Sequence, residues 1–121
     1  MLSGCVISWF NVMDPGRIAD HAGVPVICVT YEDSEGLDED IRHYFPGDTA
    51  RLAAYEKLGP RLPVELRGGG MCFIRSWGIS PEDAGTLCRD FTLEGKIPEP
   101  LRVARLCARR ASAIFPDDVS R

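Results

Sequence analysis

The chain has 121 residues, of which 45% are hydrophobic and 26% charged, so we expect a single domain over residues 1–121 with its own core. Acidic residues outnumber basic ones by 18 to 14, which gives a formal net charge of −4. A field of this sign does not attract a nucleic-acid backbone, so such a contact requires a local basic face. No apolar stretch approaches the roughly 20 residues of a membrane span, and no leader-like segment opens the chain. We therefore expect a cytoplasmic protein without membrane contact.

The first third of the chain predicts a strand, a short helix and a second strand. Residues 5–10 are apolar, β-branched and aromatic, which favours a strand. Asp14 followed by Pro15 is a helix-start signal, and Gly23 is placed to end that helix. Residues 24–31 are apolar at both the odd and the even positions, which is typical of a central strand covered on both faces. The order predicts that the two strands lie parallel and adjacent.

The remaining residues predict more helices and a hairpin. We expect helices over residues 37–45 and 49–58, from about 80 to 91, and from 100 to about 115. Between them, residues 64–77 read as a β-hairpin whose turn contains three glycines, and we place it elsewhere in the fold. The predicted fold class is α/β, with a mixed sheet and flanking helices.

Four segments, in this order and spacing, resemble one known family. They are residues 2–4 leading into 9–14 (Trp-Phe-Asn-Val-Met-Asp), 23–29 (Gly-Val-Pro-Val-Ile-Cys-Val), 77–84 (Trp-Gly-Ile-Ser-Pro-Glu-Asp-Ala) and 98–105 (Pro-Glu-Pro-Leu-Arg-Val-Ala-Arg). Together they resemble the archaeal endonuclease dU family, a formerly uncharacterised family related to endonuclease V. The resemblance implies a ribonuclease-H-like fold and magnesium- or manganese-assisted cleavage of nucleic acid near a deaminated base, a role in DNA repair.

The sequence departs from the family pattern in two ways. It looks like the C-terminal two-thirds of a member, without the N-terminal strands that supply the first metal-binding Asp. Ser3 stands where endonuclease V has an Asp, and a neutral hydroxyl cannot balance a divalent cation. We therefore expect impaired or absent catalysis in a truncated chain, with the first strand exposed for homo-oligomerisation. The alternative is a non-catalytic nucleic-acid-binding or assembly module.

Asn11 and Asp14 are the candidate catalytic residues, because they follow the first predicted strand. Asp14 has two interpretations: a metal or substrate ligand, or the N-cap of the helix that Pro15 begins. Asn11 is expected to orient a phosphate or a base. An acidic run over residues 32–40 offers Glu32 as a further ligand, or is a solvated face that suits a helix dipole.

The last predicted helix carries the candidate nucleic-acid contacts. Glu99 lies at its start, and Arg102, Arg105 and Arg109 follow at helical spacing, joined by Arg110. This basic stripe could track a phosphate backbone, or it is a salt-bridged and solvated helix face.

The cysteines and histidines predict no site. The five cysteines are widely spaced, odd in number and form no C-x-x-C pair, so we interpret them as small hydrophobic residues. His21 and His43 have no patterned partner and are interpreted as structural or surface residues.

Overall fold

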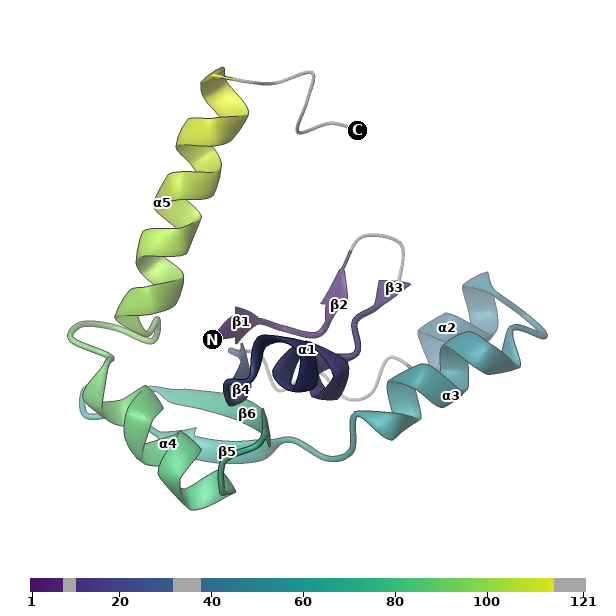
Figure 1. Cartoon of the computed structure of the whole chain (residues 1–121), viewed down its shortest axis with the longest axis horizontal. Helices are drawn as coiled ribbons and strands as arrows, with labels where there is room; N and C mark the ends of the chain where they lie inside the picture. The colour runs from purple at the N-terminus through teal and green to yellow at the C-terminus, as the bar shows by residue number, and fades with distance from the viewer. Residues whose placement is uncertain (8–10, 32–37, 115–121) are drawn as a thin grey trace.

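The computed structural model describes residues 1–7, 11–31 and 38–114, and these form a mixed β-sheet with flanking helices (Figure 1). The strands are β1 (Leu2–Ser3), β2 (Val6–Ile7), β3 (Asn11–Val12), β4 (Val26–Thr30), β5 (Leu62–Glu65) and β6 (Met71–Trp77). The helices are α1 (Pro15–Ala22), α2 (Asp38–Tyr44), α3 (Thr49–Lys57), α4 (Pro81–Asp90) and α5 (Glu99–Ile114).

The main sheet of the described residues has the order β1-β4-β6-β5. β1 pairs parallel with β4, while β6 pairs antiparallel with both β4 and β5. A separate ribbon is formed by β2 and β3. The mixed α/β class predicted from the sequence is therefore confirmed.

The core depends on β4, which is buried on both of its faces. Ile27 and Val29 point into one hydrophobic cluster, which includes residues of β5, β6 and α4. Val26 and Cys28 point into a second cluster with Cys5 and Leu58. Because successive side chains of a strand alternate between faces, this arrangement confirms the prediction of a central, doubly covered strand.

Local capping signals set the helix boundaries as the sequence predicts. Asp14 accepts a hydrogen bond from the backbone N–H of Arg17, and Gly23 ends α1 in the left-handed conformation, with φ +67°. Asp48 caps α3 and Ser80 caps α4 by the same side-chain to backbone hydrogen bond. Each cap satisfies a backbone donor that the first helical turn leaves open.

The predicted strand over residues 5–10 is wrong in position. The strand that pairs parallel with β4 is Leu2–Ser3, in register with Cys28 and Val29. Gly4 follows with φ +82°, a conformation that L side chains rarely adopt, and the chain then leaves the sheet. Val6–Ile7 instead pairs with Asn11–Val12. Residues 8–10 lie outside the described residues.

Two further corrections concern the hairpin and the cysteines. The hairpin formed by β5 and β6 does form, but β6 pairs directly with β4 instead of lying elsewhere. Cys5 and Cys28 form a disulfide, with their Cα atoms 6.3 Å apart, so they are not free thiols as we expected. The two cysteines are 23 residues apart in the sequence, and they come close together because β1 pairs parallel with β4.

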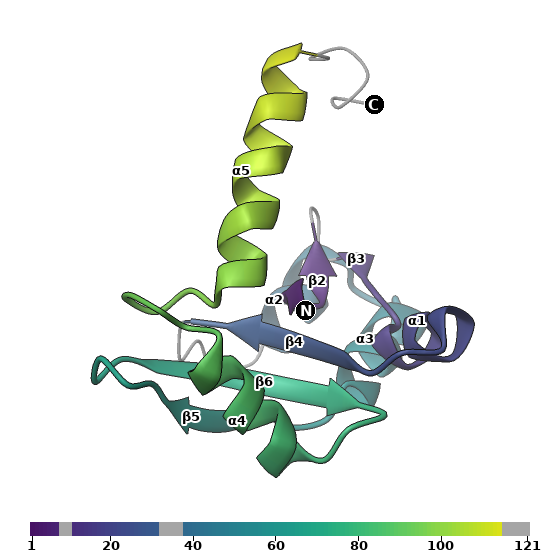
Figure 2. The ribbon, with the colours of Figure 1, turned by 60° about the vertical axis from the view of Figure 1, so that its left-hand side comes forward.

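The long helix α5 stands away from the sheet, as Figures 1 and 2 both show. Leu101, in its first turn, is its buried residue and belongs to the main core cluster. Glu99 is partly buried, and residues 100 and 102–114 are exposed. The helix therefore presents most of its surface outward.

Candidate functional site

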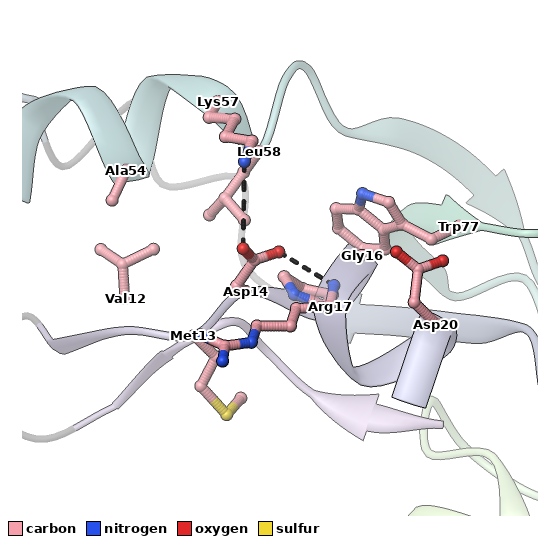
Figure 3. Close-up of a pocket in the computed structure, with 11 residues that line it drawn as sticks. Val12, Met13, Asp14, Gly16, Arg17, Asp20, Ala54, Lys57, Leu58 and Trp77 are labelled. Atoms are coloured by element: carbon pink, nitrogen blue, oxygen red, sulfur yellow. Dashed lines mark hydrogen bonds and ion pairs between the residues drawn. The ribbon is translucent and has the colours of Figure 1, made fainter. Parts of the chain in front are cut away.

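A cavity of about 430 Å³ lies between the start of α1 and the end of α3 (Figure 3). Asp14, Arg17 and Asp20 contribute its charged side chains from the α1 side, and Lys57 contributes one from α3. Trp77, at the end of β6, forms part of the wall. The cavity therefore contains one of the two candidate catalytic residues, Asp14, together with two cations.

The contacts of Asp14 are those of a helix cap. Its Oδ1 accepts from the backbone N–H of Arg17 at 3.1 Å, and its Oδ2 lies 3.9 Å from Nζ of Lys57. Figure 3 marks both contacts with dashed lines. The capping interpretation of Asp14 accounts for this geometry, whereas its role as a ligand stays a prediction. Asn11, in β3, pairs through its backbone with Ile7, and its proposed role likewise stays a prediction.

The described residues do not provide a ligand set that fits Mg²⁺ or Mn²⁺. In the part of the chain that the structure describes, no three His, Cys, Asp or Glu side chains gather where they could hold a metal ion. Arg17 and Lys57 line the cavity together with Asp14 and Asp20, so its two negative charges are already balanced by two positive ones, which weakens the attraction for a further cation. No catalytic step through a metal follows from this set. Glu32 and the rest of the acidic run up to residue 37 lie outside the described residues.

The candidate nucleic-acid contacts occupy α5 and do not meet Asp14. Arg102 and Glu99 form a bidentate pair, with Nε–Oε1 at 2.9 Å and Nη2–Oε2 at 2.8 Å. The hydrogen bond between them lowers the pKa of Glu99 and raises the pKa of Arg102. Arg105 and Arg109 are exposed, and neither has an ion-pair partner among the described residues. The salt-bridged interpretation therefore applies to Arg102, but not to Arg105 or Arg109.

A second, smaller cavity was missed by the sequence analysis. It has a volume of about 140 Å³ and is lined by Arg61 and Arg75 near the ends of β1 and β4. Arg61 precedes β5 and Arg75 lies inside β6, 14 positions later, so no helix or strand periodicity links the two. Only the pairing of the sheet brings them together, and no local pattern indicates it.

Comparisons with known proteins identify the family of this α/β chain. The sequence profile of the family described as Endonuclease dU matches residues 1–112. The chain is 43% identical over 112 residues to a UPF0215 protein of Pyrobaculum calidifontis, covering 89% of this chain and 60% of that protein. A UPF0215 protein of Pyrobaculum aerophilum is 40% identical over 112 residues, covering 92% and 60%. The chain belongs to the endonuclease dU family, and the resemblance seen in the sequence is confirmed.

A solved structure shares the fold. It is that of a protein of unknown function from Archaeoglobus fulgidus, with a TM-score of 0.71 and 27% identity, covering 93% of this chain and 61% of that one. The chain thus spans about 60% of the length of the relatives and the structure it matches. Across the described residues, none of the helices has the length and apolar character needed to cross a membrane.

Proposed function

We propose that this chain is a nucleic-acid-binding member of the endonuclease dU family, directed to strands that contain deaminated bases. The observation that carries the proposal is the exposed pair Arg105 and Arg109 on α5. They are seven and eleven positions from Pro98, lie four residues apart on one side of the helix, and have no ion-pair partner in the described ranges. Family membership supports a nuclease-like role.

Binding through α5 overcomes the unfavourable net charge of the chain. The overall charge is −4, which repels a phosphate backbone at long range. Because α5 projects from the sheet (Figure 2), its arginines can approach a strand, and Glu99 is the acidic residue that α5 itself carries. Such contacts are electrostatic, so the affinity should be weak and should depend steeply on salt.

We propose further that the chain binds without cleaving. The resemblance to endonuclease V implies an Asp at the position of Ser3, and here the side chain is an exposed, neutral hydroxyl in β1. The capping contact and the neighbouring Lys57 already engage Asp14. Cleavage of a phosphodiester by a divalent metal requires converging carboxylates, and among the described residues no three His, Cys, Asp or Glu side chains gather at one place.

The test is the salt dependence of strand binding. Fluorescence anisotropy with a uracil-containing single strand should give a negative slope of log affinity against log salt. Replacing Arg105 and Arg109 together by Ala should weaken binding and reduce that slope by about 1.4, since each phosphate contact contributes about 0.7. The matched control replaces Arg42 and Arg67, exposed arginines of α2 and the β5–β6 turn, and should leave the slope closer to that of the native chain. An unchanged slope in the α5 variant would refute the role of this helix.

A second candidate function, assembly of two copies through α5, is favoured by the apolar side of that helix. Val103, Cys107 and Ile114 share this side by spacing with a single charged residue, Arg110, and Val103 and Ile114 are 48% and 50% exposed. In an antiparallel pair of α5 helices, Cys107 lies near the midpoint and therefore beside its copy. Mild oxidation should then link two chains, and Cys107→Ser should abolish the link. A monomer in sedimentation that gives no such link contradicts this candidate.

A further inference from the structure

The side chain of Trp77 borders two neighbouring cavities along α1. One is the cavity of about 430 Å³ that contains Asp14 (Figure 3), and the other, of about 480 Å³, extends to Gly23, the C-cap of α1. Trp77, Gly16 and Asp20 line both of them. Each volume falls within the roughly 300–1,000 Å³ of pockets that hold small molecules. The indole therefore borders space for a ligand of that size.

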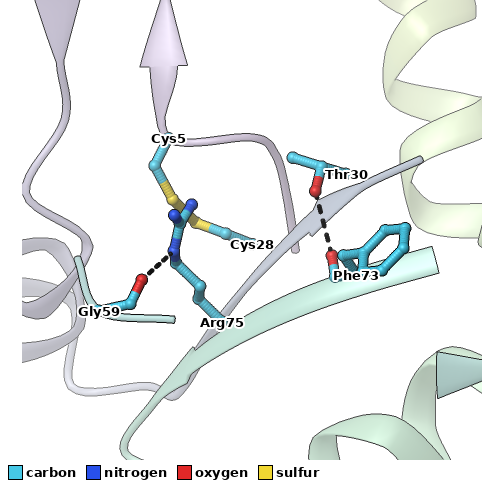
Figure 4. Close-up of a disulfide and its surroundings, with 6 residues drawn as sticks. All are labelled: Cys5, Cys28, Thr30, Gly59, Phe73 and Arg75. Carbon is cyan, nitrogen blue, oxygen red and sulfur yellow. Dashed lines mark hydrogen bonds between the residues drawn. A yellow bond between two sulfur atoms is a disulfide. The ribbon is translucent and has the colours of Figure 1, made fainter. Parts of the chain in front are cut away.

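The indole of Trp77 is held by packing but has an unused hydrogen-bond donor. Trp77 packs against the core cluster that contains Cys5 and Cys28, whose disulfide Figure 4 shows. Its Nε1–H makes no hydrogen bond with any described residue. The N–H of an enclosed indole usually has a partner. A positioned aromatic ring with an open donor suits a ligand that stacks on it and accepts a hydrogen bond.

Gly16 leaves space beside this indole. A Cβ at position 16 would lie 3.4 Å from Cδ1 of Trp77 and 3.7 Å from its Nε1. Gly16 is the second residue of α1, and its φ is not in the left-handed region, so the backbone conformation does not require glycine. Glycine is also a poorer helix former than alanine. What glycine contributes at this position is therefore the open space next to the ring.

The charges around the indole favour a neutral, polar ligand. Among the described residues, the cavity of about 430 Å³ has two carboxylates, Asp14 and Asp20, and two cations, Arg17 and Lys57. An anion would meet both carboxylates and a metal ion would meet both cations, so neither sign of charge is favoured. A nucleobase is neutral, carries donors and acceptors along its edges and has an aromatic face on each side. It therefore matches both the indole and the mixed charges.

We propose that an unpaired nucleobase of a single strand stacks on Trp77 in the space beside Gly16. Such stacking accepts any base, because every base has an aromatic face, so the contact anchors a strand without selecting its sequence. The inference deepens the proposed nucleic-acid role and rests on it: α5 contacts phosphates, and Trp77 adds a contact to a base.

The first experiment measures the base contact alone, with uridine and adenosine, which carry no phosphate. The chain has two tryptophans, so Trp9→Phe leaves Trp77 as the single indole that fluoresces. We expect both nucleosides to quench its emission and to saturate in about the millimolar range, because one stacked base binds weakly. Absence of saturable quenching by either nucleoside overturns the proposal.

A pair of glycine variants in the same background locates the site. Gly16→Leu fills the space beside the indole and should weaken nucleoside binding about tenfold. The matched control is Gly68→Leu in the β5–β6 turn, where no atom lies within 4 Å of an added Cβ, and it should bind as the background does. Equal affinity of the two variants, both folded by circular dichroism, overturns the assignment to this space.

The second experiment compares a thymidine strand with an abasic strand of the same length, so that the phosphates are equal. The native chain should bind the thymidine strand about fivefold or more tightly, and Trp77→Leu should lose this preference. Gly16→Leu replaces it if Trp77→Leu does not fold. Equal affinity of the native chain for both strands overturns the proposal. If neither strand binds, the proposed nucleic-acid function fails, whereas the nucleoside titration still decides whether Trp77 binds a base.

Discussion

Replacing Asp14 by Ala or by Asn separates its role as a helix cap from its charge. In the structure its Oδ1 accepts from the N–H of Arg17 at 3.1 Å, and its Oδ2 lies 3.9 Å from Nζ of Lys57. Ala removes both contacts. Asn is as good an N-cap as Asp, so it keeps the first contact and removes the charge alone.

The capping contact dominates the expected change in stability. Loss of an N-cap costs about 1 kcal/mol, within a range of about 0.5–2 kcal/mol. The side chains of Lys57 and Asp14 are 78% and 53% exposed, so their ion pair is screened by solvent and contributes only a few tenths of a kcal/mol, roughly. We therefore expect Asp14→Ala to lower the free energy of unfolding by about 1 kcal/mol and Asp14→Asn by less than about 0.5 kcal/mol.

Urea unfolding of the native chain and both variants measures these changes, with and without Mg²⁺. Because the contacts of Asp14 are those of a cap, Mg²⁺ should stabilise all three proteins equally or not at all. Asp14→Asn as unstable as Asp14→Ala would refute the capping argument. Stabilisation of the native chain by Mg²⁺ that is lost in Asp14→Asn would establish Asp14 as a metal ligand.

Three further predictions concern the disulfide, a buried hydroxyl and assembly. Reduction of Cys5–Cys28, which closes a loop of 23 residues, should lower the free energy of unfolding by about 3 kcal/mol, and equal stability of the oxidised and reduced chains would contradict it. The hydroxyl of Tyr31 is buried with no hydrogen-bond partner among the described residues, so Tyr31→Phe should be neutral or stabilising by about 1 kcal/mol in the same assay, and a clear loss of stability would contradict this. Because β1 is an edge of the described sheet and α5 exposes an apolar side, sedimentation should show a dimer, and a stable monomer would speak against both surfaces as interfaces.

Short-range signals predicted much of the fold. The capping side chains of Asp14, Asp48 and Ser80 each accept a hydrogen bond from the backbone N–H three residues later. Because these contacts are local, the sequence predicts them. The strand β4 was also predicted, because a strand buried on both faces must be apolar at every position. These elements also place Asp14 at the start of α1.

Long-range pairing could not be predicted in the same way. The apolar run after Gly4 looks like a core strand, yet the positive φ of that glycine turns the chain into the β2–β3 ribbon. The Cys5–Cys28 disulfide and the proximity of Arg61 to Arg75 depend on which strands pair, and a sequence pattern carries little of that information. On α5 the spacing left two interpretations of the arginines open, and the structure shows that Arg102 pairs with Glu99.

One measurement tests the proposed function most directly: incubation of the chain with a labelled uracil-containing single strand and Mn²⁺, followed by native and denaturing gels of the same sample. The account predicts a shifted strand on the native gel at low salt and an uncut strand on the denaturing gel, with the shift reduced when Arg105 and Arg109 are replaced by Ala. Cleavage that Asp14→Ala abolishes would contradict the proposal of binding without catalysis. Absence of any shift at low salt would contradict the nucleic-acid role itself.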